Sequence, residues 1–208
     1  DIKKIYGSGT TLPTTTIALP LKFDKVTPVK QQLNVRPEVL LFLSKIRQLL
    51  VKEHKKDPRL NTVSAIAITR ETGLMVRKNK NIDAVSYTLH LSADEKDKGY
   101  KGECSYFMWK RNFPVKQENK VERRMEVEEL VIILAFPLKE RLHRGMSSPG
   151  IYAFLPTEMF TNFPFIILAD FLLASSRETI LLDNKWNQGI LDCVPSAFIN
   201  AFVSLVKN

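Results

Sequence analysis

The sequence has few cysteines, few glycines and no long apolar run. Its 208 residues include 2 cysteines and 8 glycines, and both Cys104 and Cys193 lie in apolar surroundings. Because no Asn-x-Ser/Thr acceptor and no secretion signal accompanies them, the sequence predicts an intracellular protein, cytoplasmic or nuclear. The longest apolar runs, 131–136 and 165–173, fall short of the roughly 18 residues of a membrane helix. The sequence therefore predicts no membrane span.

Several motifs that would carry chemistry are also missing. There is no G-x-x-x-x-G-K-S/T, no G-x-G-x-x-G and no H-E-x-x-H. His54, His90 and His143 are far apart and lack Cys or His neighbours at ligand spacing, so the sequence predicts no metal site. Residues 145–150 superficially resemble a nucleophile elbow, but Pro149 stands where that motif needs glycine. We interpret them as a turn.

The composition is that of a folded protein with a basic bias. Apolar side chains make up 44% of the chain and charged ones 25%, which excludes low-complexity and wholly disordered classes. The net charge of +9 is uneven, because residues 149–208 hold 3 basic and 5 acidic side chains whereas residues 1–148 hold 28 and 17. This bias could attract nucleic acid, an anionic membrane surface or an acidic partner domain, although scattered lysines more often only keep a protein soluble.

The hydrophobic pattern changes its period along the chain. Alternation with β-branched residues predicts an edge strand over 14–22, and i, i+3, i+4 spacing predicts a helix over 36–53. Further strands are expected at 60–70, 84–92, 103–111, 122–136, 151–155 and 165–173. Short connections favour an antiparallel meander, and a helix over 184–206, split by Pro195, follows it. The sequence thus predicts an α/β (α+β) fold, with a mixed, mainly antiparallel sheet packed with helices.

Aromatic and basic side chains are interleaved in residues 106–113, YFMWKRNF. Such a pattern suits a single-stranded nucleic-acid platform, where rings stack on bases and cations contact phosphates. On a strand, however, Tyr106 and Met108 face one side and Phe107 and Trp109 the other, so both faces are apolar. A buried central strand is the favoured interpretation, and nucleic acid is not a favoured partner.

Residues 169–178, ADFLLASSRE, end an apolar strand with two serines and an Arg-Glu pair. An arginine fixed at the end of a rigid element can direct its planar guanidinium at a phosphate and stabilise the oxygens of phosphoryl transfer. The alternative is a structural Arg177 that caps the following helix or pairs with Glu178 or Asp183. Ser175 and Ser176 would then be turn residues at the entry to that helix.

The same segment carries a resemblance to a known family. Residues 173–180, LASSRETI, resemble the middle-domain loop of the ninety-kilodalton heat-shock chaperones, whose Ser-Arg-Glu core matches Ser176, Arg177 and Glu178. Four stretches resemble the sacsin and NO VEIN-like branch of these GHKL-type ATPases: YAFLPTE at 152–158, FPFII at 163–167, ADFLLASSRE at 169–178 and NKWN at 184–187. Residues 8–22 resemble the strand that closes a GHKL ATPase domain. A glutamine found in the family four residues after the arginine is Leu181 here.

This resemblance implies a division of the chain and roles for its residues. Residues 1–35 would hold the closing strand of an ATPase domain plus a linker, and residues 36–208 a middle domain like the transducer domain of GHKL ATPases. The chain starts at Asp1, and we expect it to be a fragment of a longer protein whose upstream part binds ATP with Mg. Arg177 would contact the ATP γ-phosphate as the catalytic and cofactor-binding residue. The loop residues Ser175, Ser176 and Glu178 would support it.

These observations lead to one main functional hypothesis with alternatives. The chain would be the transducer segment of a large chaperone-like ATPase, coupling nucleotide state to client proteins or co-chaperones, and by itself would bind and hydrolyse no ATP. Its partner within the same chain would be the upstream ATPase domain. The alternative is a non-enzymatic module that binds nucleic acid or an acidic protein through convergent lysines around 97–124. A degenerate ATPase kept as a scaffold is the third hypothesis.

Overall fold

The computed structural model describes residues 20–32, 37–43, 45–53, 62–70, 77–78, 82–94, 100–138 and 150–206. The chain divides into two compact units, Asp1–Val35 and Arg36–Asn208. The described part of the first unit consists of residues 20–22 and one helix, α2 (Phe23–Gln32). Most of the strand predicted at 14–22 lies outside the described residues, and its last three residues are not in a strand.

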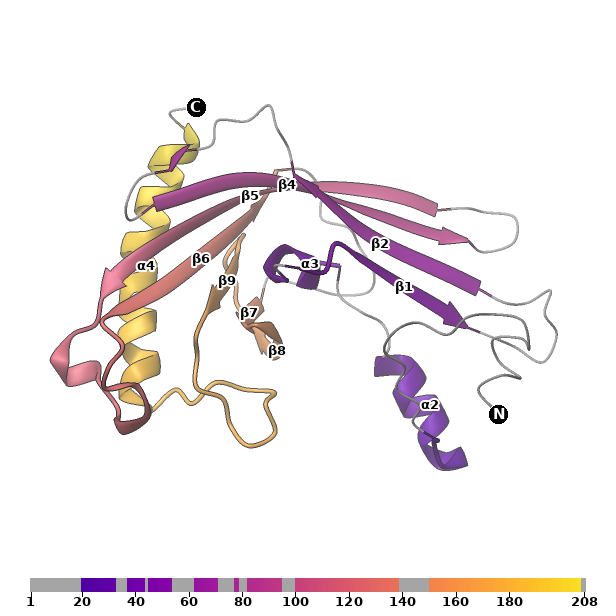
Figure 1. Ribbon diagram of the computed structural model, residues 1–208, viewed down its shortest axis with the longest axis horizontal. Coiled ribbons are helices and arrows are strands. Elements are labelled where there is room, and N and C mark those ends of the chain that lie inside the picture. The colour runs from indigo at the N-terminus through magenta and orange to yellow at the C-terminus, as the bar shows by residue number, and fades with distance from the viewer. Residues whose placement is uncertain are drawn as a thin grey trace. The chain divides into compact units, whose positions relative to one another are not determined.

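The second unit is built on a nine-stranded sheet (Figure 1). Its strands are β1 (Gln48–Glu53), β2 (Thr62–Arg70), β3 (Arg77–Lys78), β4 (Ile82–Asp94), β5 (Tyr100–Pro114), β6 (Glu129–Pro137), β7 (Gly150–Ala153), β8 (Leu155–Phe160) and β9 (Ile166–Ala169). They follow the order β1-β2-β4-β5-β6-β9-β7-β8, and β3 pairs with β4 beside this path. Strands β7 and β9 are parallel and the other described pairs antiparallel. This confirms the predicted mixed, mainly antiparallel sheet.

Strand β5 occupies the middle of the antiparallel run β2-β4-β5-β6 that the sequence predicted. Its residues Tyr106, Phe107 and Trp109 are all buried, although they alternate between the two faces of the strand. The interpretation of residues 106–113 as a buried central strand is therefore confirmed. These rings belong to the core and offer no exposed surface for stacking on bases.

The helix predicted at 36–53 is wrong for most of its length. The structure has a helix of four residues, α3 (Val39–Phe42), after which the backbone becomes extended at Leu43 and leads into β1. In β1, Leu49 and Val51 are half-buried whereas the residues between and beside them are exposed, which is the periodicity of a strand. Antiparallel pairing of β1 with the edge of β2 outweighs the helical spacing of the apolar residues.

Strand β6 begins later than the sequence predicts, since a strand was expected over 122–136 and β6 starts at Glu129. The preceding chain forms two single-turn 3-10 helices, η2 (Gln117–Asn119) and η3 (Glu122–Arg124). The side chain of Arg124 pairs with Asp170, at the end of β9. This contact holds the segment outside the sheet, where it packs beside the C-terminal helix.

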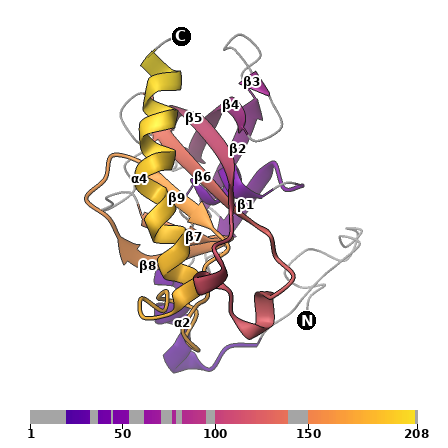
Figure 2. The same ribbon diagram turned by 90° about the vertical axis from the view of Figure 1, so that its left-hand side faces the viewer.

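That helix, α4 (Lys185–Val206), is continuous, so the predicted break at Pro195 is wrong. Pro195 is exposed whereas Val194 and Ala197 beside it are buried, and this packing keeps both halves of the helix in line. Figure 2 shows α4 lying along the sheet, where it contacts β6 and β5. With a mean hydropathy of 1.7, α4 is by length and composition alone able to cross a membrane, a test that core helices also pass. The absence of a membrane span stays a prediction.

The main core lies between α4 and the strands around β6. Its largest fully buried side chains include the indoles of Trp109 and Trp186. Phenylalanine rings continue from this core towards the surface, with centroid distances of 5.1 Å for Phe136–Phe165, 5.1 Å for Phe165–Phe198 and 5.9 Å for Phe198–Phe202. Aromatic packing thus holds the C-terminal half of α4 against the sheet.

Candidate functional site

The segment with the Ser-Arg-Glu motif forms a tight β-hairpin between β9 and α4. Leu173 and Ile180 form an antiparallel bridge, and the backbone N–H of Leu181 donates to the carbonyl of Leu172 at 3.0 Å. Nearer the tip, the N–H of Ala174 donates to Thr179 at 2.9 Å and that of Arg177 donates to Ala174 at 2.9 Å. We call residues 172–181 the Arg177 hairpin.

Arg177 lies at the exposed tip of this hairpin in an unusual backbone conformation. Its φ is 63°, in the left-handed region that non-glycine residues seldom adopt. Its side chain is exposed, and no ion pair or hydrogen bond holds it among the described residues. The guanidinium is therefore directed to solvent by a constrained main chain. A strained exposed residue of this kind points to a functional position.

The three other predicted loop residues differ in what they do. The Ser176 hydroxyl accepts a hydrogen bond from the Glu178 N–H at 3.3 Å, within the loop. Glu178 is held through its carbonyl, which accepts a hydrogen bond from the N–H of Glu158 in β8 at 2.7 Å. The side chain of Ser175 is exposed. The loop is thus anchored by main-chain contacts to β8 as well as by its own turn.

Asn187, in the first turn of α4, holds the base of the Arg177 hairpin. Its side chain is fully buried, and its Oδ1 accepts from the N–H of Leu172 at 2.8 Å. Its Nδ2 donates to the carbonyls of Leu172 at 2.8 Å and Leu181 at 2.9 Å. One amide therefore bonds to both strands of the hairpin. The sequence signal for this residue is an asparagine beside Trp186, inside the apolar face of a helix, and this pattern alone predicts no role for it.

A second polar contact fixes the start of α4 against the sheet. Arg124 forms two bonds to Asp170, with Nη1–Oδ2 at 2.7 Å and Nη2–Oδ1 at 2.9 Å. The Arg124 guanidinium also lies 5.2 Å from the ring of Trp186, whose indole N–H donates to the Asp170 carbonyl at 2.8 Å. This bidentate, stacked arrangement gives Arg124 a structural role. Arg124 and Asp170 are separated by 46 residues, so no local pattern predicts their pairing.

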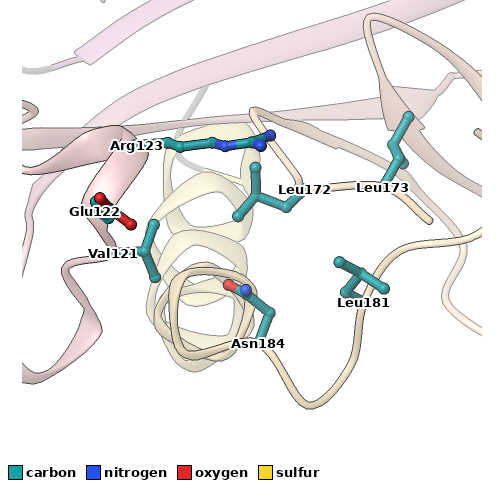
Figure 3. Close-up of a pocket in the computed structure, with 7 residues that line it drawn as sticks. All are labelled: Val121, Glu122, Arg123, Leu172, Leu173, Leu181 and Asn184. Carbon is teal, nitrogen blue, oxygen red and sulfur yellow. The ribbon is translucent and has the colours of Figure 1, made fainter. Parts of the chain in front are cut away.

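A pocket of about 290 Å³ opens between the Arg177 hairpin and η3 (Figure 3). Its lining combines four apolar side chains with three polar ones: Val121, Leu172, Leu173, Leu181, Glu122, Arg123 and Asn184. Leu181, which stands where the resembled family has glutamine, forms part of its wall. The pocket thus shares its apolar wall with the base of the hairpin that carries Arg177.

Other chemistry finds little support in the described part of the chain. No group of three His, Cys, Asp or Glu side chains there could hold a metal ion. Burial raises the pKa of the Cys193 thiol, and this outweighs the opposing effect of Lys116, so Cys193 lacks the lowered pKa of a reactive cysteine.

Many of the basic side chains expected to form an interaction surface are already paired. Lys120 is almost buried and its Nζ lies 2.6 Å from a carboxylate oxygen of Glu128. Lys116 lies 3.8 Å from Glu118, and the guanidinium of Arg111 stacks 5.0 Å from the ring of Phe113. These contacts give Lys120, Lys116 and Arg111 separate local partners.

Comparison with known proteins found one partial similarity. A stretch of 59 residues, 28% of this chain, is 43% identical to Protein NO VEIN of Arabidopsis thaliana. The same stretch covers 2% of that protein, so the similarity concerns a small part of a much longer polypeptide. No protein-family model matches the chain. No solved structure matches it either. The similarity supports a NO VEIN-like relationship.

Proposed function

We propose that this chain is the middle, transducer-like segment of a large chaperone-like ATPase of the GHKL type. In this proposal Arg177 contacts the γ-phosphate of ATP, with Mg, bound in an ATPase domain elsewhere on the same polypeptide. The observation that carries the proposal is the exposed guanidinium of Arg177 on a hairpin held from both sides. The partial similarity to NO VEIN is consistent with it.

Arginine suits this role for electrostatic and geometric reasons. Its charge is permanent, and its planar fork can donate two hydrogen bonds to phosphate oxygens at once. Charge stabilisation accelerates phosphoryl transfer only if the cation is already placed where negative charge develops. The anchors at Asn187 and Glu158 fix the main chain of the hairpin and leave the side chain of Arg177 free to reach a neighbouring domain.

The hairpin also provides a path by which nucleotide state could reach a bound client or co-chaperone. Engagement of Arg177 by a phosphate would pull on a loop whose base is bonded to the start of α4 through Asn187. Because α4 packs along β6 and β5, a displacement of its first turn is transmitted to the sheet. Ser176 and Glu178 keep the loop closed and do not themselves touch phosphate in this proposal.

ATP turnover by the intact protein tests the proposal. We expect Arg177→Ala to lower kcat by tenfold or more, since arginines that stabilise this transition state contribute about 10³-fold or more. Arg177→Lys should recover part of the loss, because a point charge replaces the bidentate fork. Lys110→Ala, which removes one exposed cation from β5, is the matched control and should leave kcat unchanged.

Melting temperatures and nucleotide affinity separate a catalytic effect from a structural one. All three variants should melt like the wild type, because the side chains are exposed. The affinity for ADP should not change, since ADP lacks the γ-phosphate. Unchanged turnover in Arg177→Ala would contradict a contact between Arg177 and the γ-phosphate, and an intact wild type without turnover would favour a scaffold.

A further inference from the structure

The pocket beside the Arg177 hairpin has the size and lining of a site for one large apolar side chain. Its volume of about 290 Å³ is at the lower limit of small-molecule sites, which begin at about 300 Å³ and extend to about 1,000 Å³. A nucleotide is too large and too polar for it. Leu181 in its wall is 42% exposed and the adjacent Leu182 54% exposed, so apolar surface continues beyond the rim.

Two hydrogen-bond donors face this apolar floor. Figure 3 shows the guanidinium of Arg123 extending over Leu172, and the amide of Asn184 pointing up from the opposite wall. Arg123 is exposed and no acceptor pairs with it among the described residues. Asn184 uses its Oδ1 to accept from the N–H of Trp186 at 2.9 Å, which leaves its Nδ2 to donate.

Arg123 and Arg124 are adjacent in the chain but differ in their contacts. Arg124 is bound to Asp170 and stacked on Trp186. Arg123 has no such partner in the described part of the chain, although it lies at the rim of a mainly apolar pocket. Glu122, from the same short helix η3, also lines the pocket, but its carboxylate lies beside Val121, whereas the Arg123 guanidinium extends over Leu172 (Figure 3).

We propose that this pocket binds a peptide segment of a partner protein, through one large apolar side chain and a nearby carboxylate. The apolar side chain occupies the space between Val121, Leu172 and Leu181. The carboxylate, from an aspartate or glutamate close by in the peptide, accepts hydrogen bonds from Arg123 and from the Asn184 amide. The charge complementarity of Arg123 selects an acidic over a basic peptide. This inference does not depend on the role proposed for Arg177.

Binding at this pocket would also support the hairpin. Leu172 and Leu181 are the two residues whose carbonyls Asn187 holds, and their side chains form the pocket wall. A side chain packed against them restricts the same main chain that carries Arg177. Partner binding and the position of the Arg177 hairpin are therefore coupled through these two leucines.

Selection from a library of short random peptides tests the proposal on the intact chain and on Arg123→Glu. We expect the wild type to enrich peptides with Leu, Phe or Met followed within a few residues by Asp or Glu. Charge reversal at Arg123 should replace the enriched acidic residue by Lys or Arg while keeping the apolar one. A wild type that enriches no motif, or a motif unchanged by Arg123→Glu, overturns the proposal.

Affinity measurements on the enriched wild-type peptide give the second test. Arg123→Glu and Leu181→Asp should each weaken binding about tenfold or more, and Leu181→Asp should be tolerated by the fold because Leu181 is half-exposed. Glu122→Gln should strengthen binding slightly by removing a like charge. Lys110→Glu, a charge reversal on β5 outside the pocket, should have no effect. If Lys110→Glu weakens binding as much as Arg123→Glu, diffuse attraction explains the result and the pocket does not.

Arg177→Ala keeps this test separate from the ATPase proposal. Because Arg177 is not part of the pocket lining, the peptide should bind this variant as it binds the wild type. A variant that loses ATP turnover but still binds the peptide would test only the role proposed for Arg177. Loss of peptide binding in Leu181→Asp with normal turnover concerns the pocket alone.

Discussion

Two arginines near the start of α4 are constrained in opposite ways. Arg124 has its side chain fixed by Asp170 and Trp186. Arg177 has an exposed side chain but a backbone held at φ 63°. Arg124 therefore stabilises the fold through its charge and its stacking. Arg177 instead has a strained backbone and a guanidinium without a partner among the described residues. The contacts of a side chain and the strain of its backbone together distinguish a structural from a functional arginine.

The first turn of α4 supports both arginines. Asn187 bonds to the base of the Arg177 hairpin, and Trp186, one residue earlier, stacks on Arg124. A left-handed non-glycine residue costs about 1–2 kcal/mol. That cost is tolerable at Arg177 because the buried contacts of its support offset it. Four variants test this arrangement, and we expect their effects on the free energy of unfolding to decrease in this order: Asn187→Ala, Asp170→Ala, Gly189→Ala and Arg177→Gly.

The largest effect is expected from Asn187→Ala, which would break the support of the hairpin. Three hydrogen bonds of the buried Asn187 side chain are lost at about 1 kcal/mol each, and the Leu172 and Leu181 main-chain groups lose their partner. We expect the free energy of unfolding in urea to fall by about 3 kcal/mol. Asn200→Ala, an exposed asparagine on the same helix, is the control and should change it by less than about 0.5 kcal/mol. Equal losses in both variants would contradict a special role for Asn187.

A smaller loss is expected from Asp170→Ala, which would give Arg124 the unpaired state of Arg177. The Arg124 side chain is 23% exposed and that of Asp170 43% exposed, so solvent screens part of the interaction. We expect destabilisation of about 1–2 kcal/mol, between the values for exposed and for buried pairs. A double-mutant cycle with Arg124→Met measures the coupling. A coupling near zero would mean that the stacking on Trp186 alone positions Arg124.

Gly189→Ala tests how closely the short helix η2 packs against this same part of α4. An added Cβ would lie 2.7 Å from Cγ of Asn119, a side chain whose Nδ2 is bonded to the Lys185 carbonyl. Overpacking costs about 1–3 kcal/mol, and the better helix propensity of alanine returns about 1 kcal/mol. We expect a net loss of about 1 kcal/mol in urea unfolding. The added Cβ would also lie 2.9 Å from Cβ of Asn119, so an Asn119→Gly background is needed to remove both contacts. In that background the substitution should become neutral or stabilising, and a persistent loss would place the clash elsewhere.

Arg177→Gly removes the backbone strain and the guanidinium together, and we expect the smallest effect on stability from it. Glycine adopts a positive φ without strain, so the unfolding free energy should rise by up to about 1 kcal/mol while the guanidinium is lost. ATP turnover by the intact protein should fall at the same time. Thermal melting beside turnover measures both quantities, and Arg177→Ala, which keeps the strain, is the matched variant. A loss of stability in Arg177→Gly would contradict the strain inferred from φ.

The sequence predicted the strands better than the helices. Alternating apolar residues with β-branched neighbours placed β2, β4 and β5 correctly, because this periodicity is also what the pleated sheet requires. The same reasoning made residues 36–53 a helix, since the consecutive apolar residues 49–51 fit either period. In the structure these residues form a strand because they pair with the edge of β2. This is a tertiary contact, so the local sequence does not reveal it.

The candidate site was predictable only in part. The Ser-Arg-Glu motif drew attention to Arg177 from the sequence, and the structure places that residue at an exposed tip. Asn187 and the Arg124–Asp170 pair could not be found in this way. Asn187 bonds to Leu172, 15 residues away, and to Leu181, 6 residues away, and Arg124 pairs with Asp170, 46 residues away. Buried polar side chains are recognised only when the groups that satisfy them are known.

Because both tryptophans are buried, intrinsic fluorescence can monitor the first turn of α4. The sequence contains 2 tryptophans, Trp109 inside the sheet and Trp186 against Arg124. In a Trp109→Phe background the fluorescence of the protein comes from one indole, whose N–H is bonded to the Asp170 carbonyl. A peptide bound beside the Arg177 hairpin, or a phosphate bound by Arg177, would then change the emission wavelength of Trp186 without any added label.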